Sequence, residues 1–246
     1  MKISVITICL NCREHIGQAL ASVQEQDYLD LEQIVVDGGS TDGTLEVIRE
    51  FATRTVGLHW VSGLDAGISD AMNKGLKLAT GDIVGFLHAD DFYPDKGVVS
   101  AVVEKFAKSS GAVWITGGLL EVDSNGRVIR TLPVRRFSRR RLLRNNIIYH
   151  PATFVRRESL AREGGFDESL RYAMDYDLWL KLSIHSDPVL LNKELACFRV
   201  HNGSISSANR LDALKEEYLV RKRRIKGPVE FLFHNLYQKY RLFIEK

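Results

Sequence analysis

Two adjacent carboxylates, Asp90 and Asp91, directly follow the short apolar segment 83–87, which is typical of a buried strand. Neighbouring carboxylates repel each other unless a cation joins them. A hard divalent ion is commonly bound by one or two carboxylates together with substrate phosphates. The pair therefore indicates a metal site that receives a phosphate-containing ligand. The alternative is that both residues simply begin a solvated turn before Pro94.

A second candidate is Asp37, which ends the apolar segment 33–37 and precedes a polar, Gly-rich turn. Its carboxylate could accept hydrogen bonds from the edge of a nucleotide base or from a ribose hydroxyl. Ser40, Thr41 and Asp42 are explained equally well as caps of the next helix, but Asp37 comes too early to cap it. The chain has no G-x-G-x-x-G and no G-x-x-x-x-G-K-[ST] motif, which disfavours a dinucleotide-dependent dehydrogenase and a P-loop protein.

The third candidate is the pair Asp175 and Asp177, at the N-terminal end of a predicted helix over 175–185 whose buried face includes Leu178 and Leu182. Either carboxylate could act as the general base that deprotonates an acceptor hydroxyl. The competing interpretation is that Asp175 only caps the helix and complements its dipole. Spacing alone does not separate these two interpretations.

The elements that must position these side chains alternate along the first half of the chain. Strands are predicted at 3–9, 33–37, 58–61, 83–87 and 112–116, and helices at 14–26, 44–54, 69–79 and 96–108. Such alternation implies βαβ crossovers and a mainly parallel, Rossmann-like sheet with helices on both faces. Ligands bind at the carboxyl ends of such strands, where Asn11, Asp37, His88 and Asp90 are expected to gather.

The second half has a different pattern. The segments 119–123 and 127–131 flank Ser-Asn-Gly and predict a hairpin. A helix at 175–185, a strand near 195–200 and two C-terminal helical stretches follow. We expect one domain over 1–206 and a basic, amphipathic helical tail over 207–246.

Composition narrows the class of protein. With 246 residues, 45% hydrophobic and 26% charged, the chain suits one large globular domain. The formal charge of +3 is too small to indicate nucleic acid binding. The three cysteines suit a reducing compartment, and Cys9-x-x-Cys12 lacks the further ligands of a zinc site. Since no signal peptide and no membrane-spanning apolar run are found, a cytoplasmic location is expected.

Seven segments, taken in order, resemble the motifs of family 2 glycosyltransferases, in particular the branch that builds bacterial exopolysaccharide, capsule and O-antigen, including colanic-acid-type enzymes. The resemblance covers roughly residues 1–206. The segments are the first strand ending in Asn11, V35-V-D-G-G-S-T-D-G-T44, D65-A-G-I-S-D-A-M-N-K-G75, G81-D-I-V-G-F-L-H-A-D-D91, G164-G-F-D-E168, M174-D-Y-D-L-W-L180 and F198-R-V-H-N-G-S-I-S206.

The resemblance implies a GT-A fold, a nucleoside-diphosphate sugar donor and a divalent metal, Mn²⁺ or Mg²⁺. It also implies inversion at the anomeric carbon during hexosyl or N-acetylhexosaminyl transfer. A UDP-sugar is favoured over a GDP-sugar, and the acceptor is a saccharide or a lipid-linked sugar. Carried over by position, the donor contacts are Asn11, Asp37, Asp65, Asn73 and Asp91, the metal ligand is Asp90 and the base is Asp175.

Three positions depart from the family's pattern. His88 replaces the first Asp of the D-x-D element, Met174 replaces the Glu of the Glu-Asp pair, and Leu10 stands where many relatives have an aromatic residue. The first two departures favour an alternative, a nucleotide-sugar-binding protein with weak or no catalysis. Retention of Asp90, Asp91 and Asp175 argues against it.

Three histidines and one further aspartate are additional candidates. His88 could still bind the metal, and His201 matches a histidine that joins the metal or diphosphate in related GT-A enzymes. His150 is a candidate for the acceptor cleft. Asp177 remains the alternative to Asp175.

Two clusters of basic residues lie outside these motifs. Residues 135–144 hold six arginines, and R221-K-R-R-I-K226 precedes an apolar helical stripe. The stripe comprises Val229, Leu232, Phe233, Leu236, Tyr240, Phe243 and Ile244. Basic residues beside such a stripe suit a helix on the anionic inner face of a membrane. The alternatives are a dimer interface and a helix that covers the core; no nucleic-acid-binding motif accompanies the arginines.

Overall fold

The computed structural model describes residues 1–200, 209–225 and 227–244 and is built on an eight-stranded mixed sheet. Along the sheet the order is β3 (Leu58–Ser62), β2 (Leu31–Asp37), β1 (Ile3–Cys9), β4 (Ile83–Phe86), β7 (Thr153–Arg156), β5 (Trp114–Val122) and β6 (Val128–Leu132). The eighth strand, β8 (Val189–Arg199), pairs with β5 off this path. The first four strands in the chain are mutually parallel, as the alternating pattern predicts.

The other half of the sheet makes it mixed. Strand β7 runs antiparallel to both β4 and β5, and β6 forms the predicted hairpin with β5, whereas β8 is parallel to β5. The short strand β7 is not predicted from the sequence. The segments 112–116 and 119–123, predicted as separate strands, merge into β5. The continuous strand requires a glycine at position 117, because a Cβ atom there would lie 2.5 Å from the Leu195 side chain of the neighbouring strand β8.

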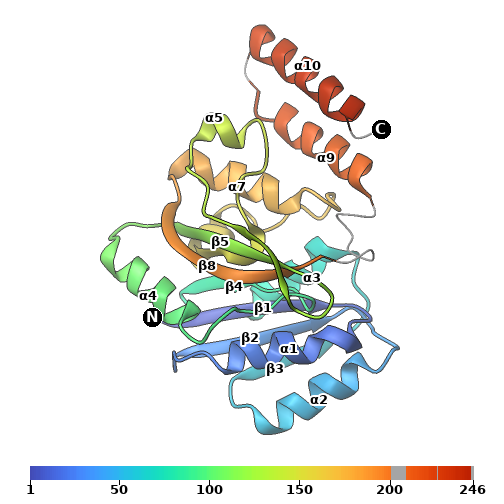
Figure 1. The fold of residues 1–246 in the computed structure, drawn as a ribbon, viewed down its shortest axis with the longest axis vertical. Helices are drawn as coiled ribbons and strands as arrows, with labels where there is room; N and C mark the ends of the chain where they lie inside the picture. Colours follow the sequence, from blue (N-terminus) through green and yellow to red (C-terminus); the bar gives the residue numbers. More distant parts are fainter. Residues whose placement is uncertain (201–208, 226, 245–246) are drawn as a thin grey trace.

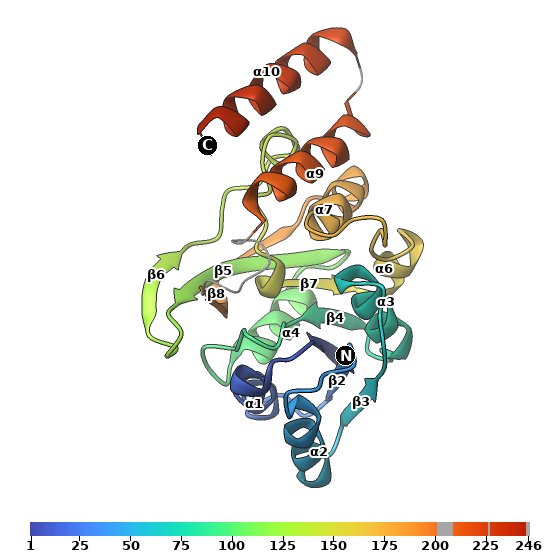
Figure 2. The same cartoon turned by 90° about the vertical axis from the view of Figure 1, so that its right-hand side faces the viewer.

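Helices cover both faces, as the fold class predicts (Figure 2). On one face, α1 (Arg13–Gln24), α2 (Thr44–Arg54) and α4 (Val98–Lys108) pack on alternate residues of the sheet such as Val5 and Val35. On the other face, α3 (Ile68–Leu78), α6 (Arg157–Arg162) and α7 (Met174–His185) pack on Ile6 and Phe86. Both faces of the central strands are therefore buried, which explains their continuous apolar sequence.

The C-terminal helices extend the molecule at one end (Figure 1). Helix α9 (Arg210–Lys222) lies between α7 and α10 (Pro228–Ile244), close to α5 (Arg139–Leu142). No helix in these described parts of the chain is long and apolar enough to cross a membrane.

Helix α9 is tied to the domain that the sequence predicts to end at residue 206. The Glu216 carboxylate accepts three backbone N–H bonds from Arg171, Tyr172 and Ala173, directly before α7. These amides have no partner within the helix and are commonly satisfied by such a cap. Helix α9 therefore helps to set where α7 begins.

Two cations of the basic stretch 221–226 point inward, contrary to the expectation that this stretch faces a membrane. Arg221 is fully buried and donates to the Arg144 carbonyl and to Gln238, while Arg224 pairs with Asp177. Both side chains bond groups that would otherwise be buried without partners, so their role is structural.

Candidate active site

The turn after β2 is organised by Asp37. The Asp37 carboxylate is fully buried and accepts hydrogen bonds from the backbone N–H groups of Gly39 and Ser40, at 3.0 Å each, and from the Ser40 hydroxyl. The Ser62 hydroxyl donates to it at 2.7 Å. These bonds hold the pKa of Asp37 below its usual value against the opposing effect of burial. Asp37 thus positions the turn, and its contact with the base or ribose of a donor stays a prediction.

Asn11 fixes the same turn from the end of β1. Its side-chain oxygen accepts the Thr41 N–H at 2.9 Å, and its own N–H donates to the Ser40 hydroxyl at 2.8 Å. The Asn11 backbone has φ of 52°, a left-handed conformation that asparagine tolerates better than most residues. Both bonds would keep 38–43 in one conformation beside an incoming donor.

Leu10, Gly38 and Asp65 meet at the carboxyl ends of β1, β2 and β3. A Cβ atom on Gly38 would lie 2.6 Å from an Asp65 carboxylate oxygen and 3.5 Å from the Leu10 side chain. Leu10 is 55% exposed, so an apolar surface and a carboxylate adjoin at this edge. Such a combination suits the face and the edge of a nucleotide base. Gly38, which sequence reasoning missed as a site residue, is required by the approach of Asp65.

Asn73 is predicted as a donor contact, but its amide is already used inside the protein. It donates to the Phe166 carbonyl and to the Glu168 carboxylate, and its oxygen accepts the Phe166 N–H at 2.9 Å. Only 8% of Asn73 is exposed. Asn73 therefore positions the G164-G-F-D-E168 segment, and its contact with the donor stays a prediction.

The turn after β4 carries Asp90 and Asp91 in different environments. Asp91 is buried and accepts the Arg199 N–H at 3.2 Å, and burial raises its pKa to about 8. Asp90 is partly exposed, and its backbone carbonyl accepts a bond from the buried Arg199 guanidinium at 3.0 Å. The two carboxylates therefore differ in burial, and Asp90 is the one that is partly exposed at the edge of the sheet.

Arg199 is the residue that links this turn to the rest of the protein, and sequence reasoning gave it no role. Besides the Asp90 carbonyl, its guanidinium donates to the carbonyls of Asp123 and Ser124 and to Gln18. Its place within the F198-R-V-H segment is the only sequence signal for it. Arg199 holds the acidic turn against both α1 and the β5–β6 hairpin.

His88 and His150 come together although 62 positions separate them in the chain, with ring centroids 5.2 Å apart. His150 also contacts Trp179 of α7 at 5.8 Å, and Trp179 lies one helical turn after Asp175. Within the described residues, His88 Nε2 and both ring nitrogens of His150 are buried without a hydrogen-bond partner. Burial lowers the pKa of both histidines, so both are neutral near pH 7.

These groups fit a divalent metal supported by a substrate. The neutral His88 ring has an unused nitrogen two residues from the Asp90 carboxylate. A carboxylate suits Mn²⁺ or Mg²⁺, and a neutral imidazole nitrogen is a common metal ligand in proteins. The described residues contain no cluster of three or more side chains that could hold a metal alone. The remaining ligands would therefore come from donor phosphates. His201, the other predicted metal ligand, lies outside the described residues.

Asp175 has the features expected of a general base. It lies in the first turn of α7, is partly exposed, and accepts from the Asn146 side chain at 3.0 Å and from the Tyr176 N–H at 2.6 Å. Burial raises its pKa to about 6, against the opposing effect of these two bonds. A carboxylate with a pKa near 6 is ionised at neutral pH and is a stronger base than an ordinary one.

Asp177, the alternative base, is used structurally. It is 1% exposed and pairs with Lys181 at 2.9 Å and with Arg224 of the C-terminal region at 3.1 Å. A carboxylate that is buried and held by two cations is poorly accessible to an acceptor hydroxyl. The structure therefore favours Asp175 over Asp177 and leaves Asp177 to join α7 to the C-terminal helices.

Comparison with known proteins decides the family. The model of the family described as "Glycosyl transferase family 2" matches residues 4–165. The chain belongs to glycosyltransferase family 2. Its sheet and helices match those of solved GT-A glycosyltransferases, so the predicted GT-A fold is confirmed.

Relatives of this family 2 glycosyltransferase include the chondroitin synthase of Escherichia coli, 31% identical over 221 residues that make up 88% of this chain and 31% of the synthase. An uncharacterized glycosyltransferase of Mycobacterium tuberculosis is 32% identical over 200 residues, covering 80% of this chain and 74% of its own. The chain thus spans about a third or less of the length of the chondroitin and hyaluronan synthases it matches.

Two solved structures share the fold at lower identity. TarS 1–349 of S. aureus in complex with UDP-GlcNAc has a TM-score of 0.71 and 22% identity, covering 89% of this chain and 65% of that one. The mannosyltransferase PcManGT of Pyrobaculum calidifontis, in complex with GDP-Man and Mn²⁺, has a TM-score of 0.72 and 24% identity, covering 96% and 69%.

Proposed function

We propose that this chain is an inverting, metal-dependent glycosyltransferase. It transfers a hexosyl or N-acetylhexosaminyl group from a nucleoside-diphosphate sugar to a lipid-linked saccharide acceptor. This reaction is a step in the synthesis of a cell-surface polysaccharide. The observation that carries the proposal is the placement of Asp175. Its carboxylate lies on α7, which contacts the turn bearing His88 and Asp90 through Trp179 and His150.

The chemistry assigned to these residues is a single displacement. The acceptor hydroxyl oxygen attacks the anomeric carbon as the bond to the donor diphosphate breaks, and Asp175 takes the hydroxyl proton. One attack from the face opposite the leaving group inverts the anomeric configuration. Asp90 and His88 would hold the metal, which when bound stabilises the negative charge that develops on the diphosphate. Asp37 and Asn11 would keep the nucleotide turn in place, and Asp91 would orient the donor sugar.

Relatives support the donor class. Of the two solved structures of the same fold, TarS is in complex with UDP-GlcNAc and PcManGT is in complex with GDP-Man and Mn²⁺. A UDP-sugar is our first choice. The exposed Leu10 beside Asp65 offers an apolar surface to either base, so both nucleotides belong in the test.

The second candidate function is a nucleotide-sugar-binding protein with weak or no catalysis, favoured by His88 and Met174 in place of the family's acidic residues. The test is incubation with a panel of UDP- and GDP-sugars, Mn²⁺ and lipid-linked or free saccharide acceptors. Product mass and the anomeric configuration by NMR are then measured. Formation of a product of inverted configuration supports the proposal. Binding of a donor without transfer to any acceptor of the panel favours the second function.

The pH dependence of transfer tests the role of Asp175 independently. Because the base must be ionised and its pKa is raised to about 6, kcat/KM should fall below pH 6 by about tenfold per pH unit. Replacing Asn146 by Ala removes a bond that stabilises the carboxylate, so the acid limb should move to higher pH. An acid limb near pH 4 that ignores the Asn146 substitution would contradict this assignment.

We also propose that the enzyme is peripheral on the inner face of the plasma membrane and docks through α10. This helix packs its polar side on the protein: His234 and Gln238 are buried, and Gln238 bonds Leu214 and Arg221. Its apolar side faces outward and comprises Phe231, Leu232, Phe233, Leu236, Tyr240, Phe243 and Ile244, all at least 39% exposed. The side chain of Val229, also predicted in the stripe, lies outside the described residues. The core-covering alternative is thus disfavoured.

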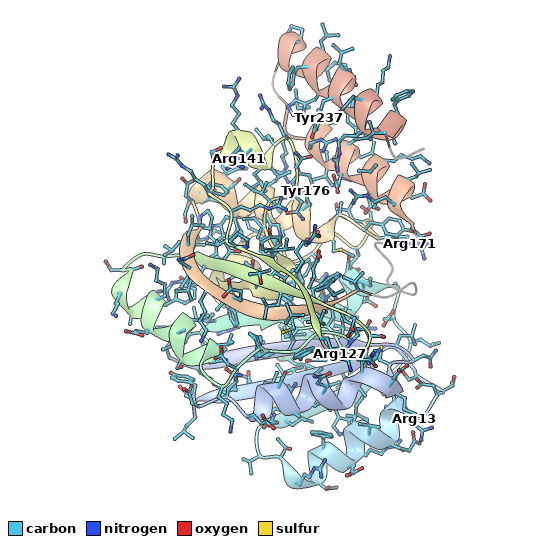
Figure 3. All side chains as sticks on the ribbon, in the orientation of Figure 1. Arg13, Arg127, Arg141, Arg171, Tyr176 and Tyr237 are labelled. Atoms are coloured by element: carbon cyan, nitrogen blue, oxygen red, sulfur yellow. The ribbon has the colours of Figure 1, made fainter. Side chains whose placement is uncertain are left out.

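Charge favours an anionic bilayer over a second copy of the chain. Arg144 lies 5.3 Å from the Phe233 ring and Lys222 5.7 Å from the Phe231 ring, so cations flank the apolar face. Figure 3 shows Arg141 on α5 and Tyr237 on α10 at the same end of the molecule. A symmetric dimer through α10 would bring two such basic surfaces together. Anionic headgroups would neutralise them instead.

Vesicle co-sedimentation checks this docking. The intact chain should bind vesicles of phosphatidylcholine and phosphatidylglycerol, and binding should weaken as salt rises. Leu232→Asp with Leu236→Asp should lower binding by more than about tenfold, because two side chains lose their burial in lipid. Arg139→Gln with Arg140→Gln should lower it by about 30-fold, at about 1 kcal/mol per arginine.

Matched controls are available at the end of the molecule opposite α10 (Figure 1). Leu29 is 99% exposed, and Arg49 and Arg54 are exposed on α2, so Leu29→Asp and the pair Arg49→Gln, Arg54→Gln should leave vesicle binding unchanged. A stable dimer that the α10 substitutions dissociate, without vesicle binding by the intact chain, would overturn the proposal.

A further inference from the structure

A cavity of about 400 Å³ lies between the arginine-rich segment 135–144 and the C-terminal helices, apart from the donor and metal residues described above. Its lining is almost entirely polar and comprises Arg135, Asn145, Asn146, Ile148, Arg210, Glu217 and Arg241. Three arginines in one cavity are unusual unless anions compensate them, because like charges repel at short range.

The charge of the cavity is positive. Glu217 is its single acidic residue among those that line it, and it pairs with Arg241 at 2.5 Å and with the buried Arg221 at 3.7 Å. This carboxylate is therefore neutralised by cations of the C-terminal helices. Arg135, whose side chain donates to the Tyr149 hydroxyl at 2.9 Å, and Arg210 lie on the exposed rim. Among the residues that line the cavity, three are arginines and one is acidic, so the lining carries more cationic than anionic groups.

The cavity adjoins the base. Asn146 lines the cavity and donates to the Asp175 carboxylate at 3.0 Å, so one side chain connects the two sites. Glu217, on another wall, is close enough to influence Asp175 electrostatically. A molecule whose hydroxyl approaches Asp175 would therefore present its neighbouring groups to Arg135, Arg210 and Arg241.

We propose that this cavity is an acceptor subsite that binds the diphosphate of the acceptor, in the part that joins its first sugar to the lipid. The inference rests on the proposed function for the identity of Asp175 as base, and it adds the chemical class of the acceptor. Arginine suits this task because its planar, forked guanidinium makes paired hydrogen bonds to phosphate oxygens. The same end of the molecule carries the outward apolar face of α10, where the lipid would enter the bilayer.

Inorganic pyrophosphate is the probe, measured by isothermal titration calorimetry in the presence of EDTA so that the metal-dependent donor site does not bind it. The intact chain should bind pyrophosphate. Arg135→Gln and Arg210→Gln should each weaken binding by about tenfold, the size expected for losing one charge-assisted contact. Both side chains are on the exposed rim, so neither substitution is expected to unfold the chain.

The control is Arg136→Gln, which makes the same charge change in the same segment but does not line the cavity. Equal weakening by Arg136→Gln, or loss of binding on Asp90→Asn, would place pyrophosphate elsewhere and overturn the proposal. Tighter binding of glucuronate than of pyrophosphate, with the same arginine dependence, would overturn the phosphate assignment in favour of an acidic sugar. None of these measurements depends on sugar transfer, so a failed transfer assay and a failed subsite are distinguishable.

Discussion

Replacing Asp175 by Asn should lower sugar transfer by at least about a hundredfold, while binding of the nucleotide donor stays unchanged. The loss of a positioned general base typically costs between about 10² and 10⁴ in rate. Asparagine has nearly the same shape and can still accept the Tyr176 N–H, but it cannot take a proton from the acceptor. Its amide would face the Asn146 amide that now donates to the carboxylate, so a small loss of thermal stability is also expected.

The matched control for this experiment is Asp177→Asn, two residues along the same helix. Asp177 pairs with Lys181 and Arg224, so its substitution leaves two cations partly buried and should lower the melting temperature more than the rate per folded molecule. Rates are therefore compared at equal concentrations of folded protein. Near-normal turnover by the Asp175→Asn variant, or a larger rate loss in the Asp177 variant, would assign the base elsewhere.

Local patterns were enough to predict the parallel half of the sheet. Strands β1 to β4 and their helices are set by periodicity within short windows, and the carboxyl ends of those strands carry the polar residues that the topology requires. Strand β7 was missed because it has only four residues, and its stability comes from pairing with β4 and β5, far away in the chain. Likewise, Gly117 and Gly118 interrupt the pattern of β5 but serve the close approach of neighbouring chain segments.

The candidate site shows the same division between local and distant information. Sequence reasoning selected Asp90 and Asp175, whose positions follow from the element that carries each. It gave Asn73 a donor contact but no structural role, because nothing local shows that its amide bonds Phe166, 93 residues away. Glu216 and Asn146 were missed for the same reason, since their roles exist only through their contacts with residues before and within α7. Whether a polar side chain is available to a ligand depends on such long-range partners.

The second large effect concerns the metal. With Mn²⁺ present, UDP or GDP at about 100 times its dissociation constant should stabilise the fold by about 2.7 kcal/mol. For a chain of this length, that corresponds to a rise of about 5–10 °C in melting temperature. In EDTA most of this rise should disappear, because the diphosphate would lose the cation that joins it to the protein.

Asp90→Asn should abolish the difference between Mn²⁺ and EDTA. The Asp90 backbone carbonyl would keep its bond from Arg199, so the turn should remain folded, whereas the side chain would no longer offer an anionic ligand. His88→Ala should reduce the difference only in part, since imidazole contributes a neutral ligand. Asp187→Asn, an exposed carboxylate beyond the C-terminal end of α7, makes the same charge change and should leave the difference intact. If nucleotide stabilises the unsubstituted chain equally in Mn²⁺ and in EDTA, Asp90 is not a metal ligand. The leaving diphosphate would then have to be stabilised by protein cations alone.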